Sequence, residues 1–210
     1  MTQLLAFGDS NTHGTKPMLR KGMFRRYKRD ERWPRLTAKQ LGWSVAEAGL
    51  PGRTTHFEDP LMGRSMDGRL GLDIALKSHA PIDYLTIMLG TNDTKTRFGA
   101  TPEQITAGMA CLLDIALNPE MQERHDGFQV LVICPPQVLE TGALAGEFIG
   151  ATAKSAALPG LYADLAQARG VGFMDAGAVV ESSQTDGIHL EPEAQPKLAA
   201  AAAKALTELG

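Results

Sequence analysis

The segment YLTIMLGTND, residues 84–93, joins an apolar run to an abrupt polar end. The run at 84–89 lies between Pro81 and Gly90, which is typical of a strand buried on both faces of a parallel sheet. Similar but shorter runs predict four more strands, at 4–7, 43–48, 130–134 and 171–174. We therefore expect a sheet with residues 84–89 as a buried strand.

Helical patterns separate these runs. They lie at residues 32–41, 70–79, 101–116, 143–168 and 192–206, with a break expected at Pro159-Gly160. The third of these opens with the clearest signal, because Thr101 can cap the helix while Pro102 and Gln104 suit its first turn. Strands that alternate with helices predict an α/β fold with a five-stranded parallel sheet and helices on both faces.

Composition limits the classes of protein that fit. The chain has 210 residues, 43% of them hydrophobic, so we expect a single domain spanning residues 1–210. A net charge of −3 does not favour nucleic acid or a membrane surface as the main partner. No signal peptide and no apolar stretch of membrane-spanning length is visible, so we expect a cytoplasmic location. The two cysteines, Cys111 and Cys134, are expected to be free thiols.

Four polar segments fall after predicted strands. They are GDSNT at 8–12, GLPGRTT at 49–55, GTND at 90–93 and DGIH at 186–189. Ligands of parallel α/β sheets bind beyond the carboxyl ends of the strands. We therefore expect these distant segments to meet at one edge of the sheet.

Together these segments hold the parts of an acyl-transfer site. Ser10 is the candidate nucleophile, and a serine hydroxyl needs a base to take its proton. His189 is the candidate base, because an imidazole changes charge near neutral pH. Asp186, three residues earlier, is placed to orient the imidazole and to stabilise its cation.

A tetrahedral intermediate also needs hydrogen-bond donors aimed at its oxyanion. The candidates are the backbone N–H groups of Ser10 and Gly52 and the side-chain amide of Asn92. Each residue alone also fits a turn or a helix cap, so the hypothesis rests on their combination. No metal site and no cofactor is predicted, since ligand spacings such as C-x-x-C or H-E-x-x-H are missing from the sequence.

In these ordered segments the sequence resembles the SGNH (GDSL-type) hydrolases, named for a Ser, Gly, Asn and His in four sequence blocks. The match is closer to the bacterial arylesterase/acyltransferase branch in ERWP (31–34), GLPGRTT (49–55), IMLGTNDTK (87–95) and DGIHL (186–190). This resemblance implies a three-layer α/β/α, flavodoxin-like fold. It also implies a homo-oligomer that hydrolyses short acyl esters, aryl esters included, without a cofactor and that can transfer acyl groups to alcohols.

The sequence departs from the family next to the nucleophile. Asn11 stands where the family commonly has leucine, and His13 stands where the branch often has an aromatic residue. Both departures concern the substrate rather than the triad. We expect substrate contacts from Asn11, Thr12, Thr91 and Ile188.

The segment RKGMFRRYKR, residues 20–29, carries six basic residues. It follows the Ser10 segment, so we expect it near the mouth of the site. A solvated loop, a subunit contact and guidance of an anionic substrate all fit it.

Two other functions stay open at this stage. A carbohydrate O-deacetylase would use the same triad, and Asn11 or His13 would suit a sugar. A non-catalytic, flavodoxin-like module would bind a small ligand at the same strand ends. The leading hypothesis is a serine esterase that acts on acetyl-type esters.

Overall fold

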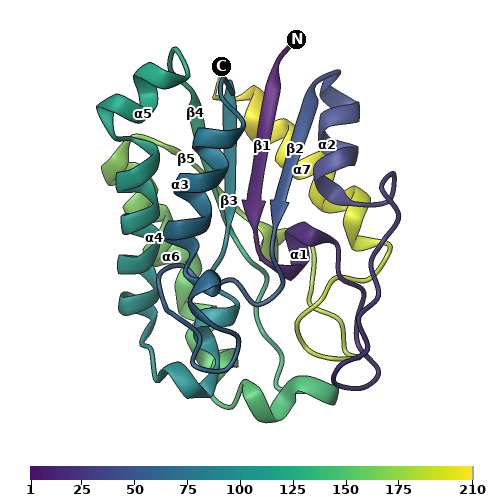
Figure 1. Ribbon diagram of the computed structural model, residues 1–210. Helices are drawn as coiled ribbons and strands as arrows, with labels where there is room; N and C mark the ends of the chain where they lie inside the picture. The colour runs from purple at the N-terminus through teal and green to yellow at the C-terminus, as the bar shows by residue number, and fades with distance from the viewer. Residues whose placement is uncertain (210) are drawn as a thin grey trace.

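The five predicted strands form one parallel sheet in a computed structural model that describes residues 1–209 (Figure 1). Their order across the sheet is β2-β1-β3-β4-β5. The strands are β1 (Gln3–Gly8), β2 (Ser44–Gly49), β3 (Tyr84–Met88), β4 (Gln129–Cys134) and β5 (Gly172–Asp175). The α/β class and the parallel sheet are thus confirmed.

Helices cover both faces of the sheet, as Figure 1 shows. Helices α3, α4 and α6 contribute to one core, while α2 and α7 contribute to the other. The helices are α1 (Ser10–His13), α2 (Trp33–Leu41), α3 (Gly68–Ser78), α4 (Pro102–Ala116), α5 (Pro119–Arg124), α6 (Ala151–Arg169) and α7 (Ala194–Thr207).

Alternate residues of each strand enter opposite cores. In β1, Leu5 and Phe7 pack with α3 and α4, whereas Leu4 and Ala6 pack with α2 and α7. Successive side chains of a strand point to opposite faces, so a strand covered on both sides must be apolar throughout. This is why β3 reads as a continuous apolar run.

The chain reverses direction across the sheet between β1 and β3. It runs outward from β1 to β2 and then returns to build β3, β4 and β5 on the other side. Loops leaving β1 and β3 diverge at such a point and leave a crevice beyond the carboxyl ends of the strands. The topology therefore places a binding site beside the segments that follow β1 and β3.

One helix prediction is wrong. The break expected at Pro159-Gly160 is not present, and α6 runs unbroken from Ala151 to Arg169. A proline inside a helix costs a hydrogen bond and crowds the preceding turn. Leu158 and Tyr162 on either side are completely buried in the core, and this packing offsets the cost. Residues 142–147 form a separate 3₁₀ segment, so the expected start at 143 is also corrected.

No helix within residues 1–209 is both long enough and apolar enough to span a membrane.

Candidate active site

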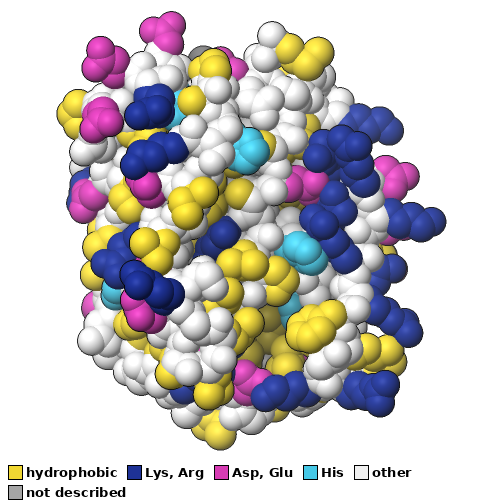
Figure 2. All heavy atoms as spheres, in the orientation of Figure 1, with side chains coloured by type: hydrophobic (Ala, Val, Ile, Leu, Met, Phe, Trp, Pro, Cys, Tyr) yellow, Lys and Arg dark blue, Asp and Glu magenta, His cyan; other side chains and the backbone are white. Residues whose placement is uncertain are grey.

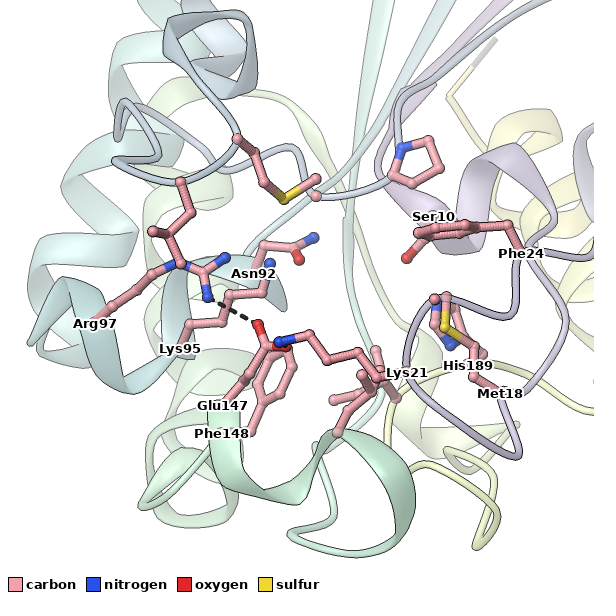
Figure 3. Close-up of a pocket in the computed structure, with 17 residues that line it drawn as sticks. Ser10, Met18, Lys21, Phe24, Asn92, Lys95, Arg97, Glu147, Phe148 and His189 are labelled. Carbon is pink, nitrogen blue, oxygen red and sulfur yellow. Dashed lines mark hydrogen bonds and ion pairs between the residues drawn. The ribbon is translucent and has the colours of Figure 1, made fainter.

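A cavity of about 300 Å³ lies at the carboxyl ends of the strands. Four residues predicted to take part in catalysis or oxyanion binding line it: Ser10 after β1, Gly52 after β2, Asn92 after β3 and His189 in the segment before α7. Figure 3 shows Ser10 and His189 on one wall and Asn92 on the opposite wall. The segments that sequence placed at one edge of the sheet do meet there.

Ser10 opens the short helix α1 directly after β1. Gly8 allows the sharp exit from the strand, because a Cβ there would stand 2.8 Å from the Met88 carbonyl oxygen. Asp9 caps α1 by accepting the Asn11 N–H at 2.9 Å. The backbone N–H of Ser10 has no acceptor within residues 1–209, so it is free to donate into the cavity.

His189 and Asp186 form a buried pair. The Nδ1 atom of His189 lies 2.6 Å from Oδ2 of Asp186. The other carboxylate oxygen accepts the N–H groups of Ile188 and His189, and Oδ2 also accepts the Met18 N–H at 2.6 Å. Burial opposes ionisation of Asp186, but these bonds outweigh it and lower the pKa of its carboxyl. The ionised carboxylate fixes the proton of His189 on Nδ1 and leaves Nε2 as the basic atom.

Gly52 has a backbone conformation that favours glycine. Its φ is +93°, and a Cβ would stand 2.5 Å from Cε of Met62 and 3.1 Å from Sδ of Met66. Met62 lines the cavity, whereas Met66 packs behind Gly52. The Gly52 N–H has no acceptor within the described chain, so it matches the Ser10 N–H as an available donor.

Asn92 is held by its own donors. Its Nδ2 atom lies 3.1 Å from Oδ2 of Asp9 and 3.1 Å from the Arg53 carbonyl oxygen. Both amide hydrogens therefore have acceptors in the resting site. An oxyanion would have to share one of them or take it from the Arg53 carbonyl.

Two buried carboxyls support the site, and the sequence analysis did not identify either in this role. Asp9 contacts Asn92, and Asp93 accepts the N–H and hydroxyl of Thr55 at 2.8 and 2.5 Å. Burial raises the pKa of each carboxyl to about 6, although the hydrogen bonds lower it in part. The signal was present in the sequence, because each residue is adjacent to a predicted site residue, Ser10 or Asn92.

Only one of the four predicted substrate contacts lines the cavity. Ile188 lines the cavity as expected, but Asn11, Thr12 and Thr91 are buried outside its lining. Asn11 instead donates to the Ile188 carbonyl oxygen at 3.1 Å and so ties the Ser10 segment to the His189 segment. His13 also lies outside the cavity lining. Asn11 and Thr12 support the site from behind, because the tight α1 turn faces them into the protein.

The remaining cavity wall is apolar with four charged groups. Figure 2 shows hydrophobic side chains around a hollow on this face of the molecule. The apolar part comes from Met18, Phe24, Pro51, Leu61, Met62, Leu144, Phe148 and Ile188, and the charged part from Lys21, Lys95, Arg97 and Glu147. Lys21 and Phe24 belong to the basic segment 20–29, which lies at the cavity as predicted.

Residues 1–209 hold no group of three or more His, Cys, Asp or Glu side chains arranged to bind a metal ion.

Comparison with known proteins agrees with this geometry. The profile of the GDSL-like Lipase/Acylhydrolase family matches residues 6–195. An aryl esterase from M. smegmatis is 34% identical with a TM-score of 0.94, and Est24, a carbohydrate acetylesterase from Sinorhizobium meliloti, is 36% identical with a TM-score of 0.94. A putative arylesterase from Agrobacterium tumefaciens is 34% identical with a TM-score of 0.89. All three alignments cover 100% of both chains. No curated protein sequence matches the chain.

Proposed function

Since the chain belongs to the GDSL-like lipase/acylhydrolase family and is a carboxylic ester hydrolase, we propose that it cleaves short acetyl-type esters through a Ser10-His189-Asp186 triad. Aryl esters are included among the proposed substrates. The observation that carries this proposal is the 2.6 Å contact between Asp186 and His189 at a cavity that Ser10 also lines. Family membership removes the alternative of a non-catalytic, flavodoxin-like module.

The first chemical step is attack by Ser10 on the ester carbonyl. His189 takes the hydroxyl proton and then gives it to the departing alcohol, which leaves an acyl group on Ser10. Asp186 stabilises the imidazolium that exists between these two transfers. Water then attacks the acyl carbon while His189 takes its proton, and the acyl–Oγ bond breaks as His189 returns that proton to Ser10, which releases the acid and restores the resting enzyme.

The oxyanion of each tetrahedral intermediate is held by the backbone N–H groups of Ser10 and Gly52. The absence of other acceptors for these two donors within residues 1–209 supports that role. Asn92 is the third donor, and it gives the oxyanion a hydrogen now shared with the Arg53 carbonyl. Preorganised donors of this kind account for a large part of the rate in acyl transfer.

A carbohydrate acetylesterase is the second candidate. The 36% identity to Est24 over the full length of both chains favours it. The predicted sugar contacts from Asn11 and His13 do not support it, because neither side chain lines the cavity. A tenfold higher kcat/KM for an acetylated sugar than for an aryl acetate would favour this candidate, since it corresponds to about 1.4 kcal/mol of transition-state binding.

Acyl transfer to alcohols and association of copies are further parts of the proposal. A largely apolar cavity supports transfer, because it favours an organic alcohol over water as the acceptor. Phe24 and Leu61 at the cavity are 74% and 78% exposed, which supports a contact with a second copy. Product analysis in the presence of alcohol and sedimentation velocity test these two points. A cytoplasmic location stays a prediction.

The test of the triad is turnover of 4-nitrophenyl acetate by the wild type, Ser10→Ala and Ser78→Ala. Ser78 is an exposed serine at the end of α3 and serves as the matched control. We expect Ser10→Ala to lose at least about a thousandfold in kcat while the control keeps wild-type turnover. Circular dichroism must show that both variants are folded. A folded Ser10→Ala protein with wild-type kcat would overturn the proposal.

A further inference from the structure

The positively charged side chains at the cavity outnumber the carboxylates that pair with them. Arg97 contacts Asp59 at 2.6 Å and Glu147 at 2.8 Å, and Lys21 contacts Glu147 at 2.7 Å. Lys95 makes no ion pair and no side-chain hydrogen bond with any residue from 1 to 209. The three cations and two carboxylates of this group therefore leave one positive charge, on Lys95.

Lys95 belongs to the site rather than to the surface. It is 5% exposed, lines the cavity and follows the 3₁₀ turn that carries Asn92. Figure 3 shows its side chain on the same wall as Asn92, facing the cavity across from Ser10 and His189. Its nearest aromatic contact is Phe148, whose ring centre lies 5.7 Å from Nζ. This cation–π contact lies near the long end of the usual range, and the ring carries no net negative charge that could serve as a counter-ion.

The surroundings of Lys95 do not neutralise it. Burial and the neighbouring Arg97 together lower the pKa of its ammonium to about 8, although the opposite charges of Asp59, Glu147 and Asp9 partly offset them. Asp59 and Glu147 are already bound to Arg97 or Lys21. A buried cation without its own counter-ion is costly to fold. An anion brought by the substrate would remove that cost at the moment of binding.

We propose that Lys95 is a specificity residue that binds a carboxylate carried by the ester substrate. The inference rests on the proposed ester hydrolysis at Ser10 and narrows its substrate class. The apolar wall takes the acyl and aryl carbons, and the carboxylate forms a charge-assisted hydrogen bond with Nζ of Lys95. Either the acyl half or the alcohol half of the ester could carry the carboxylate that contacts Lys95, so both halves are tested.

The experiment compares matched pairs of anionic and neutral esters. For the alcohol half the pair is 4-acetoxybenzoate and its methyl ester, and for the acyl half it is phenyl hemisuccinate and phenyl butyrate. The quantity measured is the ratio of kcat/KM for the anionic ester to kcat/KM for its neutral match. The proteins are the wild type, Lys95→Met, Lys95→Arg and Lys39→Met, an exposed lysine on α2 that controls for loss of one charge.

We expect the ratio of at least one pair to fall about tenfold or more in Lys95→Met, as the loss of a charge-assisted hydrogen bond requires. Lys95→Arg should recover part of the ratio, and Lys39→Met should keep it. In the wild type the ratio should also decline as pH rises through about 8, where Lys95 loses its proton, and this decline should vanish in Lys95→Met. Unchanged ratios in both pairs would overturn the inference. So would an equal loss on the anionic and neutral esters, because that result assigns Lys95 a structural or general role.

A binding measurement separates this inference from the proposed function. If the wild type hydrolyses none of the esters, ester hydrolysis at Ser10 fails while the anion contact is still measurable. Calorimetric titration of Ser10→Ala with 4-acetoxybenzoate is then compared with the Ser10→Ala/Lys95→Met double variant. Binding at least tenfold weaker in the double variant supports the contact, and equal or undetectable binding in both rejects it.

Discussion

The buried Asp186 carboxylate gives the sharpest test of the proposed triad, through the substitution Asp186→Asn. The change keeps the shape of the side chain but replaces one carboxylate oxygen with an amide. In the wild type, Oδ2 of Asp186 accepts from two donors, Nδ1 of His189 and the Met18 N–H, each at 2.6 Å. An amide nitrogen placed there would oppose the Met18 N–H and would force the His189 proton onto Nε2. That tautomer cannot accept the proton of Ser10.

The structure sets the expected size of both effects. A wrong tautomer with intact geometry costs about 10⁴-fold in kcat, or about 5 kcal/mol of transition-state stabilisation. The Met18 N–H loses a charged acceptor, so the unfolding free energy should fall by about 1.5–3 kcal/mol. Because its pKa is lowered in the fold, Asp186 stabilises the protein above about pH 4, and this contribution is lost as pH falls below that value. The stability difference between wild type and Asp186→Asn should therefore shrink in acid.

The assay is turnover of 4-nitrophenyl acetate together with urea unfolding at pH 7 and at pH 3–4. Asp175→Asn is the control, since Asp175 caps a distant 3₁₀ turn after β5. A kcat within tenfold of wild type would refute the assigned role of Asp186. A stability difference that stays constant down to pH 3 would refute the assigned charge state.

Three further predictions concern the supports of the site and the helix that differed from expectation. Gly52→Ala should lower kcat by about tenfold to a hundredfold, because the new Cβ collides with Met62 at 2.5 Å and displaces an oxyanion donor; steady-state kinetics with wild-type kcat would contradict this. The pKa of Asp93 is raised to about 6 in the fold, so the unfolded chain loses this proton at a lower pH than the folded protein does. The unfolding free energy of the wild type should therefore fall as pH rises from 4 to 6, and Asp93→Asn should remove up to about 3 kcal/mol of that fall. Denaturant titrations with the same pH slope as wild type would count against that account. Pro159→Ala should raise the unfolding free energy by about 1–3 kcal/mol by restoring helix hydrogen bonding; a lower melting temperature would show that the proline is required.

Strand prediction succeeded because both faces of this sheet are covered. A short, continuous apolar run such as 84–89 is typical of a strand buried on both faces, and β3 occupies Tyr84–Met88. Helix prediction was weaker where composition gave a misleading local signal. Pro159-Gly160 suggests a break, but the burial of Leu158 and Tyr162 makes the unbroken helix more stable. Local propensity is a weak guide when tertiary packing opposes it.

The sequence also did not predict the roles of the side chains next to the nucleophile. Asn11 and Thr12 are polar and adjacent to Ser10, which suggests substrate contact, yet the turn of α1 points them into the protein. Asp9 and Asp93 were equally visible, but only their burial and their bonds to Asn92 and Thr55 identify them as supports. Adjacency in sequence does not determine which way a side chain points.

By itself the sequence determined the strands, their parallel arrangement and the four polar segments that meet at their ends. These follow from hydrophobic periodicity and from the rule that parallel strands place their carboxyl ends together. Only the tertiary structure decided what faces the cavity. Lys95 ends the IMLGTNDTK segment and Glu147 lies about fifty residues later outside any motif, but folding pairs Glu147 with Lys21 and Arg97 and leaves Lys95 without an ion-pair partner in residues 1–209. Such pairing depends on distances between distant segments, and no local pattern of residues encodes those distances.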